Sequence, residues 1–81
     1  MRHELKILPI FYDAVKSGDK TFEIRWNGDR GYQKGDTVIF RAHQGASYDS
    51  TRPDDIEVVI TYVSTYRQKE GVCVFGFKVM K

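Results

Sequence analysis

The sequence predicts an α+β fold, specifically a small mixed β-barrel of about five strands with one short helix after the first strand. Three observations support this prediction. Segments rich in β-branched and aromatic residues recur along the 81-residue chain, and turn residues separate them. A single short helical pattern follows the first of these segments. A flat sheet of this size would leave its edge strands exposed, and closing it into a barrel around the helix removes most of that exposure.

The first elements are an extended segment at residues 5–9 and a helix at residues 10–17. Pro9 restricts the backbone before the helix and suits its first turn, and Gly18 provides a left-handed stop after it. The helix is too short to be stable alone, so its apolar stripe must dock on a sheet. The residues expected in that stripe are Phe11, Ala14 and Val15.

The rest of the chain reads as strands joined by short, mostly antiparallel connections. Strands are expected at residues 21–26, 37–42, 56–63 and 72–80, with polar turns at 27–31, 34–36 and 66–71. Gly76, inside the last strand, is expected at a bulge or a close backbone approach. The glycine- and serine-containing segment 43–55 is expected to be a flexible loop.

Size and composition favour one globular domain spanning residues 1–81. The formal net charge of +2 permits a nucleic-acid partner without requiring one. Cys73 is the only cysteine, which excludes an internal disulfide, and its apolar surroundings predict a core residue in a reducing cytoplasm. His3 and His43 have no third ligand at a suitable spacing, so we expect no metal and no cofactor. No apolar stretch is long enough to span a membrane.

The strand at residues 21–26 carries the densest chemistry. Alternation places Thr21, Glu23 and Arg25 on one face, which we expect to be exposed. The other face then holds Phe22, Ile24 and Trp26, with Trp26 in the core or at its rim. Lys20 precedes the strand and can lean towards Glu23. One acid and two bases on one face predict a polar binding site, although a solvated ladder of Glu and Arg would give the same pattern.

Gly18, Lys20, Glu23 and Arg25 match a G-x-K-x-x-E-x-R motif, and on these residues the sequence resembles the ASCH domains of the PUA-like superfamily. It is most similar to a group of short bacterial and phage ASCH-like proteins of unknown function. The similarity covers residues 5–25, 29–32, 34–36 and 71–80, whereas segment 43–55 is unlike the bulkier stretch expected there.

The resemblance implies a cleft between the helix and the barrel that binds RNA or a nucleotide. Arg and Lys suit phosphates and base edges, and an exposed tyrosine can stack on a base. Tyr32 can also be a partly buried anchor. The candidate ligand-binding residues are Lys20, Thr21, Glu23, Arg25, Arg30 and Tyr32.

Two alternatives stay open, and with them the question of whether the protein is an enzyme. Some relatives in the wider superfamily are amidohydrolases acting on N4-acetylcytidine. By that likeness, Lys20 and Glu23 are candidate catalytic residues of a small hydrolase acting on a modified nucleoside or on RNA. The other alternative is a protein-interaction module that uses aromatic surface residues.

Overall fold

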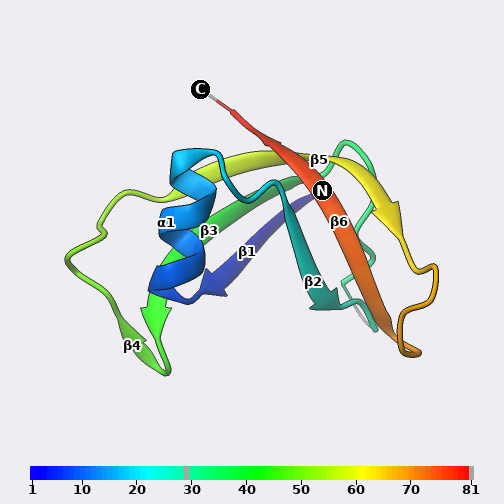
Figure 1. The fold of residues 1–81 in the computed structure, drawn as a ribbon, viewed down its shortest axis with the longest axis horizontal. Coiled ribbons are helices and arrows are strands. Elements are labelled where there is room, and N and C mark those ends of the chain that lie inside the picture. Colours follow the sequence, from blue (N-terminus) through cyan, green and yellow to red (C-terminus); the bar gives the residue numbers. More distant parts are fainter. Residues whose placement is uncertain (29, 81) are drawn as a thin grey trace.

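The computed structural model describes residues 1–28 and 30–80 and has a mixed α+β fold. One helix and a six-stranded sheet account for its regular structure (Figure 1). The elements are β1 (Arg2–Ile7), α1 (Pro9–Ser17), β2 (Phe22–Trp26), β3 (Thr37–Gln44), β4 (Ser47–Tyr48), β5 (Ile56–Ser64) and β6 (Val72–Val79). The predicted short helix after the first strand is therefore confirmed.

The strand order is β1-β3-β5-β6-β2, with the short β4 paired to β3. β1 runs parallel to β3, and the other ladders are antiparallel. The register shifts on β5 between Ile60 and Tyr62, opposite Phe77 and Gly76. Gly76 thus lies across from the irregularity, which is on the partner strand rather than on β6 itself.

The expected barrel is not closed. β1 and β2 are the two ends of the strand order, and no ladder joins them within the described residues. In Figure 1 these two strands run at a wide angle to each other, which does not suit backbone pairing. A side chain makes the link instead, because Arg25 of β2 donates from Nη2 to the carbonyl oxygen of Lys6 in β1 at 2.8 Å.

The core contains apolar side chains from β1, β3, β5 and β6 together with residues of α1 and Tyr32 from the connection between β2 and β3. It comprises Leu5, Ile7, Tyr12, Val15, Tyr32, Val38, Phe40, Ala42, Ile56, Val58, Ile60, Cys73, Phe75 and Phe77. The prediction that Cys73 is a core residue is confirmed, since its side chain is fully buried.

Helix α1 ends where the sequence predicts and begins one residue earlier, at Pro9. Pro9 occupies its first turn, and Gly18 ends it with a left-handed φ of 90°. The predicted buried face of the helix is wrong at Phe11, which stays 42% exposed. Its neighbour Tyr12 is buried instead, together with Val15. The Tyr12 hydroxyl donates to the carbonyl oxygen of Asp54 at 2.6 Å, which satisfies the polar end of a buried tyrosine.

Segment 43–55 is more structured than expected for a loop. Its first part forms a hairpin in which His43 pairs with Tyr48. Arg52 then bonds to Asp13 of α1 at 2.6 Å and to Asp49 at 2.8 Å. The segment is therefore tied to the helix by the Arg52–Asp13 ion pair, which composition alone does not reveal.

Candidate functional site

The two faces of β2 are the reverse of the sequence expectation. Glu23 is only 5% exposed, whereas Phe22, Ile24 and Trp26 are 46%, 55% and 63% exposed. The reason is the register with β6, in which Glu23 lies opposite Phe75. Directly opposed residues share a face of the sheet, and Phe75 is fully buried, so Glu23 points inward with it.

A buried carboxylate is costly unless it is paired, and Lys20 provides the partner. Its Nζ atom donates to Glu23 Oε2 at 2.8 Å, and both side chains are largely shielded from solvent. Arg25 extends this polar cluster, with Nε at 3.9 Å from Glu23 Oε1. The structure therefore brings Lys20, Glu23 and Arg25 together, as the motif predicts, but on the inner side of the strand.

Two aromatic rings flank the lysine. Lys20 Nζ lies 4.3 Å from the ring centroid of Phe11 in α1 and 5.6 Å from that of Phe22 in β2. Both distances are within the range of cation–π attraction. The helix and β2 thus hold the ammonium group between them.

These residues line a cleft of about 310 Å³ between α1 and β2, at the lower end of the size range of small-molecule sites. The residues lining this α1–β2 cleft are Phe11, Lys20, Phe22, Glu23 and Ile24. The cleft combines apolar walls with one acidic and one basic group. It can therefore hold a flat, partly apolar ligand that also offers hydrogen-bond donors and acceptors.

Four of the six candidate residues do not line this cleft: Arg25, which lies beside Glu23, and Thr21, Arg30 and Tyr32. Thr21 is exposed, and its carbonyl oxygen accepts a hydrogen bond from the Phe77 amide at 2.9 Å, which continues the β2–β6 contact. Arg30 is exposed in the turn that follows β2. Its charge acts at a distance from the cleft and not as part of its wall.

Tyr32 lies in the core, where an aromatic ring cannot stack on a ligand base. Its ring centroid is 4.7 Å from that of His3 and 5.0 Å from that of Phe75. Its amide donates to the side-chain oxygen of Asn27 at 2.9 Å. The reading of Tyr32 as an anchor after the turn agrees with this position, while its proposed stacking role does not.

Sequence reasoning missed the apolar walls of the cleft: Phe11, Phe22 and Ile24. It assigned them to the core because apolar residues in alternation usually face inward. A signal was present in Lys20, which stands three residues before Glu23. A lysine and a glutamate that can pair at this distance allow the glutamate to be buried, and the alternate residues then face outward.

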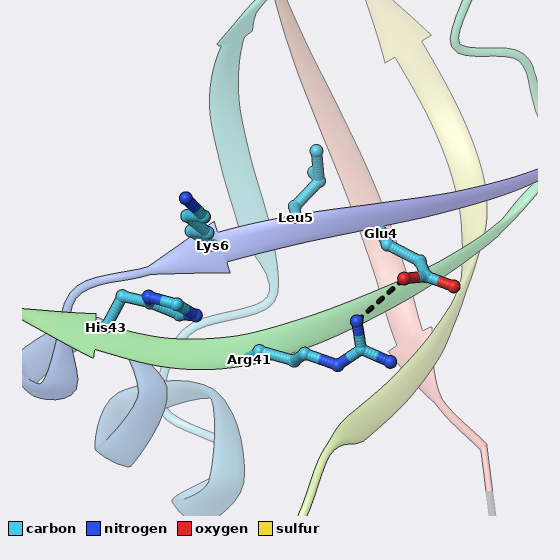
Figure 2. A pocket seen from close by; sticks show the side chains of 5 residues that line it. All are labelled: Glu4, Leu5, Lys6, Arg41 and His43. Atoms are coloured by element: carbon cyan, nitrogen blue, oxygen red, sulfur yellow. Dashed lines mark hydrogen bonds and ion pairs between the residues drawn. The ribbon is translucent and has the colours of Figure 1, made fainter. Parts of the chain in front are cut away.

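A second pocket, of about 210 Å³, lies on β1 and β3 and is lined by Glu4, Leu5, Lys6, Arg41 and His43. Figure 2 shows Arg41 reaching towards Glu4 at one end, with His43 at the other. The hydrogen bonds that Arg41 donates to Asp55 and Glu4 raise the pKa of its guanidinium, so its charge is already matched by two carboxylates. His43 Nδ1 is buried without a hydrogen-bond partner in the part of the chain that the structure describes. The pocket contains none of the candidate residues.

Within residues 1–28 and 30–80, no cluster of three or more His, Cys, Asp and Glu side chains is placed to hold a metal ion. The one helix in the same residues is neither long nor apolar enough to cross a bilayer.

Comparison with known proteins gives a family but no activity. A family model described as a domain of unknown function (DUF3850) matches residues 2–77, which is nearly the whole chain. No curated protein matches the sequence.

Proposed function

The chain belongs to the DUF3850 family, and we propose that it is an RNA- or nucleotide-binding module whose ligand occupies the α1–β2 cleft. One observation carries the proposal: two phenylalanine rings flank a shielded lysine–glutamate pair in an open cleft. Nucleobases require this combination of flat apolar contact and edge hydrogen bonding.

Each wall of the cleft has a role in the proposed complex. Phe11 and Phe22 provide ring faces for stacking a base, which is favourable for every base because each has a π-face. Glu23 accepts a hydrogen bond from an exocyclic amino group, and Lys20 donates to a ring carbonyl or a phosphate. Arg25 adds a second positive charge beside the carboxylate, and its guanidinium has five N–H groups, of which the bond to Lys6 uses one.

The motif supports the same proposal. Of the residues that carry the resemblance to ASCH domains, Lys20 and Glu23 line this cleft, and Arg25 lies beside Glu23. Under the proposal, the open sheet is a variant of the PUA-like barrel, and the protein acts in the cytoplasm on RNA or a nucleotide.

The 2.8 Å contact between Lys20 and Glu23 also favours a second candidate, a small hydrolase acting on an acylated nucleoside. In that reaction the Glu23 carboxylate accepts a proton from water as the water oxygen attacks the acyl carbon, and the Lys20 ammonium group donates a hydrogen bond to the acyl oxygen. The proton then passes to the N4 nitrogen as the acyl C–N bond breaks, which releases the nucleoside and acetic acid, and the acid ionises to acetate. Acetate release from N4-acetylcytidine by the wild type, abolished in a folded Lys20→Ala variant, would establish this activity.

Binding is tested by fluorescence-anisotropy titration of a labelled single-stranded RNA and a labelled hairpin RNA at two salt concentrations, with unlabelled nucleotides as competitors. We expect binding that weakens as salt rises, because phosphate contacts release counterions. Phe11→Ala should weaken binding about tenfold through the loss of one stacking surface.

Ile10→Ala is the matched control, since Ile10 is exposed on the same helix but does not line the cleft. Circular dichroism of both variants checks that the fold is retained. Absence of binding by the wild type to every RNA and nucleotide, or equal affinity of the two variants, would overturn the proposal.

A further inference from the structure

β2 exposes a row of apolar side chains on its outer face. Phe22, Ile24 and Trp26 all point outward there, and we refer to these three residues as the β2 outer row. Their cross-strand partners on β6 are Gly76, Val74 and Val72, which add no charge to this face. Exposed apolar residues grouped in this way mark an interaction surface rather than scattered surface side chains.

The β2 outer row is continuous with the α1–β2 cleft. Phe22 and Ile24 line the cleft, and Trp26 is the next outward residue along the strand. Alternate residues of a strand are roughly 6.5–7 Å apart, so the row extends roughly 13–14 Å from Phe22 to Trp26. A ligand that fills only the cleft leaves Trp26 uncovered.

Trp26 is held in place by backbone. Gly28 and Gly71 lie against its indole ring, and a Cβ atom on either glycine would overlap the ring. The Asn27 amide bonds to the Gly71 carbonyl oxygen at 2.6 Å, which ties the two glycine segments together. Trp26 as a residue remains 63% exposed although glycine backbone lies against its ring. It is therefore a preformed platform, and a partner that stacks on it does not need to immobilise it.

Basic residues flank both ends of the row. Lys20 is at the cleft end, and Arg67 and Lys69 are in the turn that leads to Gly71 at the Trp26 end. Glu70 is the acidic member of that turn. The β2 outer row has an aromatic ring at each end and positive charges beyond both ends. This arrangement complements stacked bases joined by phosphates better than it complements an apolar protein surface.

We propose that the ligand is a single-stranded RNA that continues from the α1–β2 cleft along the β2 outer row, with one base beside Phe22 and another stacked on Trp26. This inference rests on the proposed function and narrows its ligand class from a nucleotide to an oligonucleotide. The strand is held by stacking at two fixed aromatic positions, and its phosphates lie near Lys20, Arg67 and Lys69.

Trp26 is the only tryptophan of the chain, so its fluorescence reports on this position alone. The test titrates the wild type with a ribonucleoside monophosphate and with a single-stranded hexaribonucleotide. Excitation is set at the red edge of tryptophan absorption, where bases do not absorb. We expect the hexanucleotide to quench Trp26 and to bind at least about tenfold more tightly than the monophosphate.

Variants separate the two positions. Trp26→Ala should weaken hexanucleotide binding about tenfold and leave monophosphate binding unchanged, and Trp26→Phe should restore part of the loss. Phe11→Ala should weaken the binding of both the monophosphate and the hexanucleotide. Tyr48→Ala, which removes an exposed aromatic ring outside β2, is the matched control and should affect neither.

The outcomes distinguish the two proposals. Equal affinity for both ligands without Trp26 quenching overturns the oligonucleotide inference and leaves nucleotide binding in place. No binding of either ligand overturns the proposed function and the inference together. A change in Trp26 emission that depends on protein concentration alone, with dimers in sedimentation, assigns the β2 outer row to a second copy of the chain and overturns the inference. The quenching experiment uses the unmodified protein, so it stands even where a Trp26 variant fails to fold.

Discussion

Arg25 donates a hydrogen bond to the carbonyl oxygen of Lys6 at 2.8 Å and so connects the two strands at opposite ends of the sheet order. A barrel would make this connection with a ladder of backbone bonds. Here one guanidinium group replaces the ladder, and the same group lies beside Glu23 at the edge of the cleft. Arg25 is therefore expected to stabilise the fold in addition to contacting a ligand.

Replacing Arg25 with alanine should lower the free energy of unfolding. The bond to Lys6 joins a charged donor to a backbone oxygen and is partly shielded, so we expect a loss of about 1–2 kcal/mol. Urea unfolding measures the loss. Arg30→Ala is the control, since Arg30 is exposed in a turn and should change the stability by less than about 0.5 kcal/mol. Equal stability of the two variants would show that the link between β1 and β2 contributes nothing.

The Lys20–Glu23 pair should behave as a coupled unit. Lys20→Met leaves a buried carboxylate without its partner and should cost about 2–3 kcal/mol of unfolding free energy. Changing both residues, with Lys20→Met and Glu23→Leu, removes both charges and should cost less than the sum of the single changes. A double-mutant cycle measures this coupling, which we expect to exceed about 1 kcal/mol. Simple additivity would mean that the two charges do not stabilise each other.

Asp36 should make the fold sensitive to acid. Burial alone raises the pKa of Asp36, but hydrogen bonds from His3, from the Met1 amino group and from the Gln33 amide outweigh it, so the pKa is lowered. A carboxyl group with a lower pKa in the folded state stabilises the fold above its unfolded pKa. It loses that contribution as the pH falls through the folded value.

We therefore expect the urea midpoint of the wild type to hold from neutral pH downward and to fall below about pH 4, near the ordinary pKa of an aspartate. Asp36→Asn should be less stable at neutral pH and show a shallower decline in acid. Parallel curves for the two proteins would contradict the role assigned to Asp36.

The Cys73 thiol should be unreactive in the folded protein. Its side chain is fully buried, and burial raises the pKa of the thiol, so both access and the thiolate form are disfavoured. A maleimide should label it on the order of a hundredfold more slowly in buffer than in urea. Equal rates in buffer and in urea would mean that β6 opens readily.

The elements that local chemistry determines could be predicted from the sequence. Pro9 and Gly18 define the ends of α1 because one fixes φ and the other accepts a left-handed conformation. The β-branched run of β5 and the apolar surroundings of Cys73 were sufficient to place both in the sheet. These features depend on residues close together in the chain.

The predictions that were wrong concern features that depend on contacts between residues far apart in the sequence. The faces of β2 are set by the register of Glu23 against Phe75, fifty-two positions later, and a pattern within β2 alone cannot reveal that register. Tyr12 is buried, and its hydroxyl is satisfied by the carbonyl oxygen of Asp54, forty-two positions later, which a pattern within the helix cannot reveal. The motif grouped Lys20, Glu23 and Arg25, which lie close together in the structure, while the apolar walls of the cleft emerge only from the three-dimensional arrangement.

The strand order also sets when the site can exist during folding. β2 has a single ladder partner, β6, so the polar cluster and its aromatic walls have no sheet to lie on until residues 72–79 are in place. While β6 has not yet emerged from the ribosome, a nascent chain can form α1 and the β3–β5 pair but not the cleft. Any ligand of the cleft therefore selects the completely folded chain, and by mass action it stabilises the fold as a whole rather than one part of it.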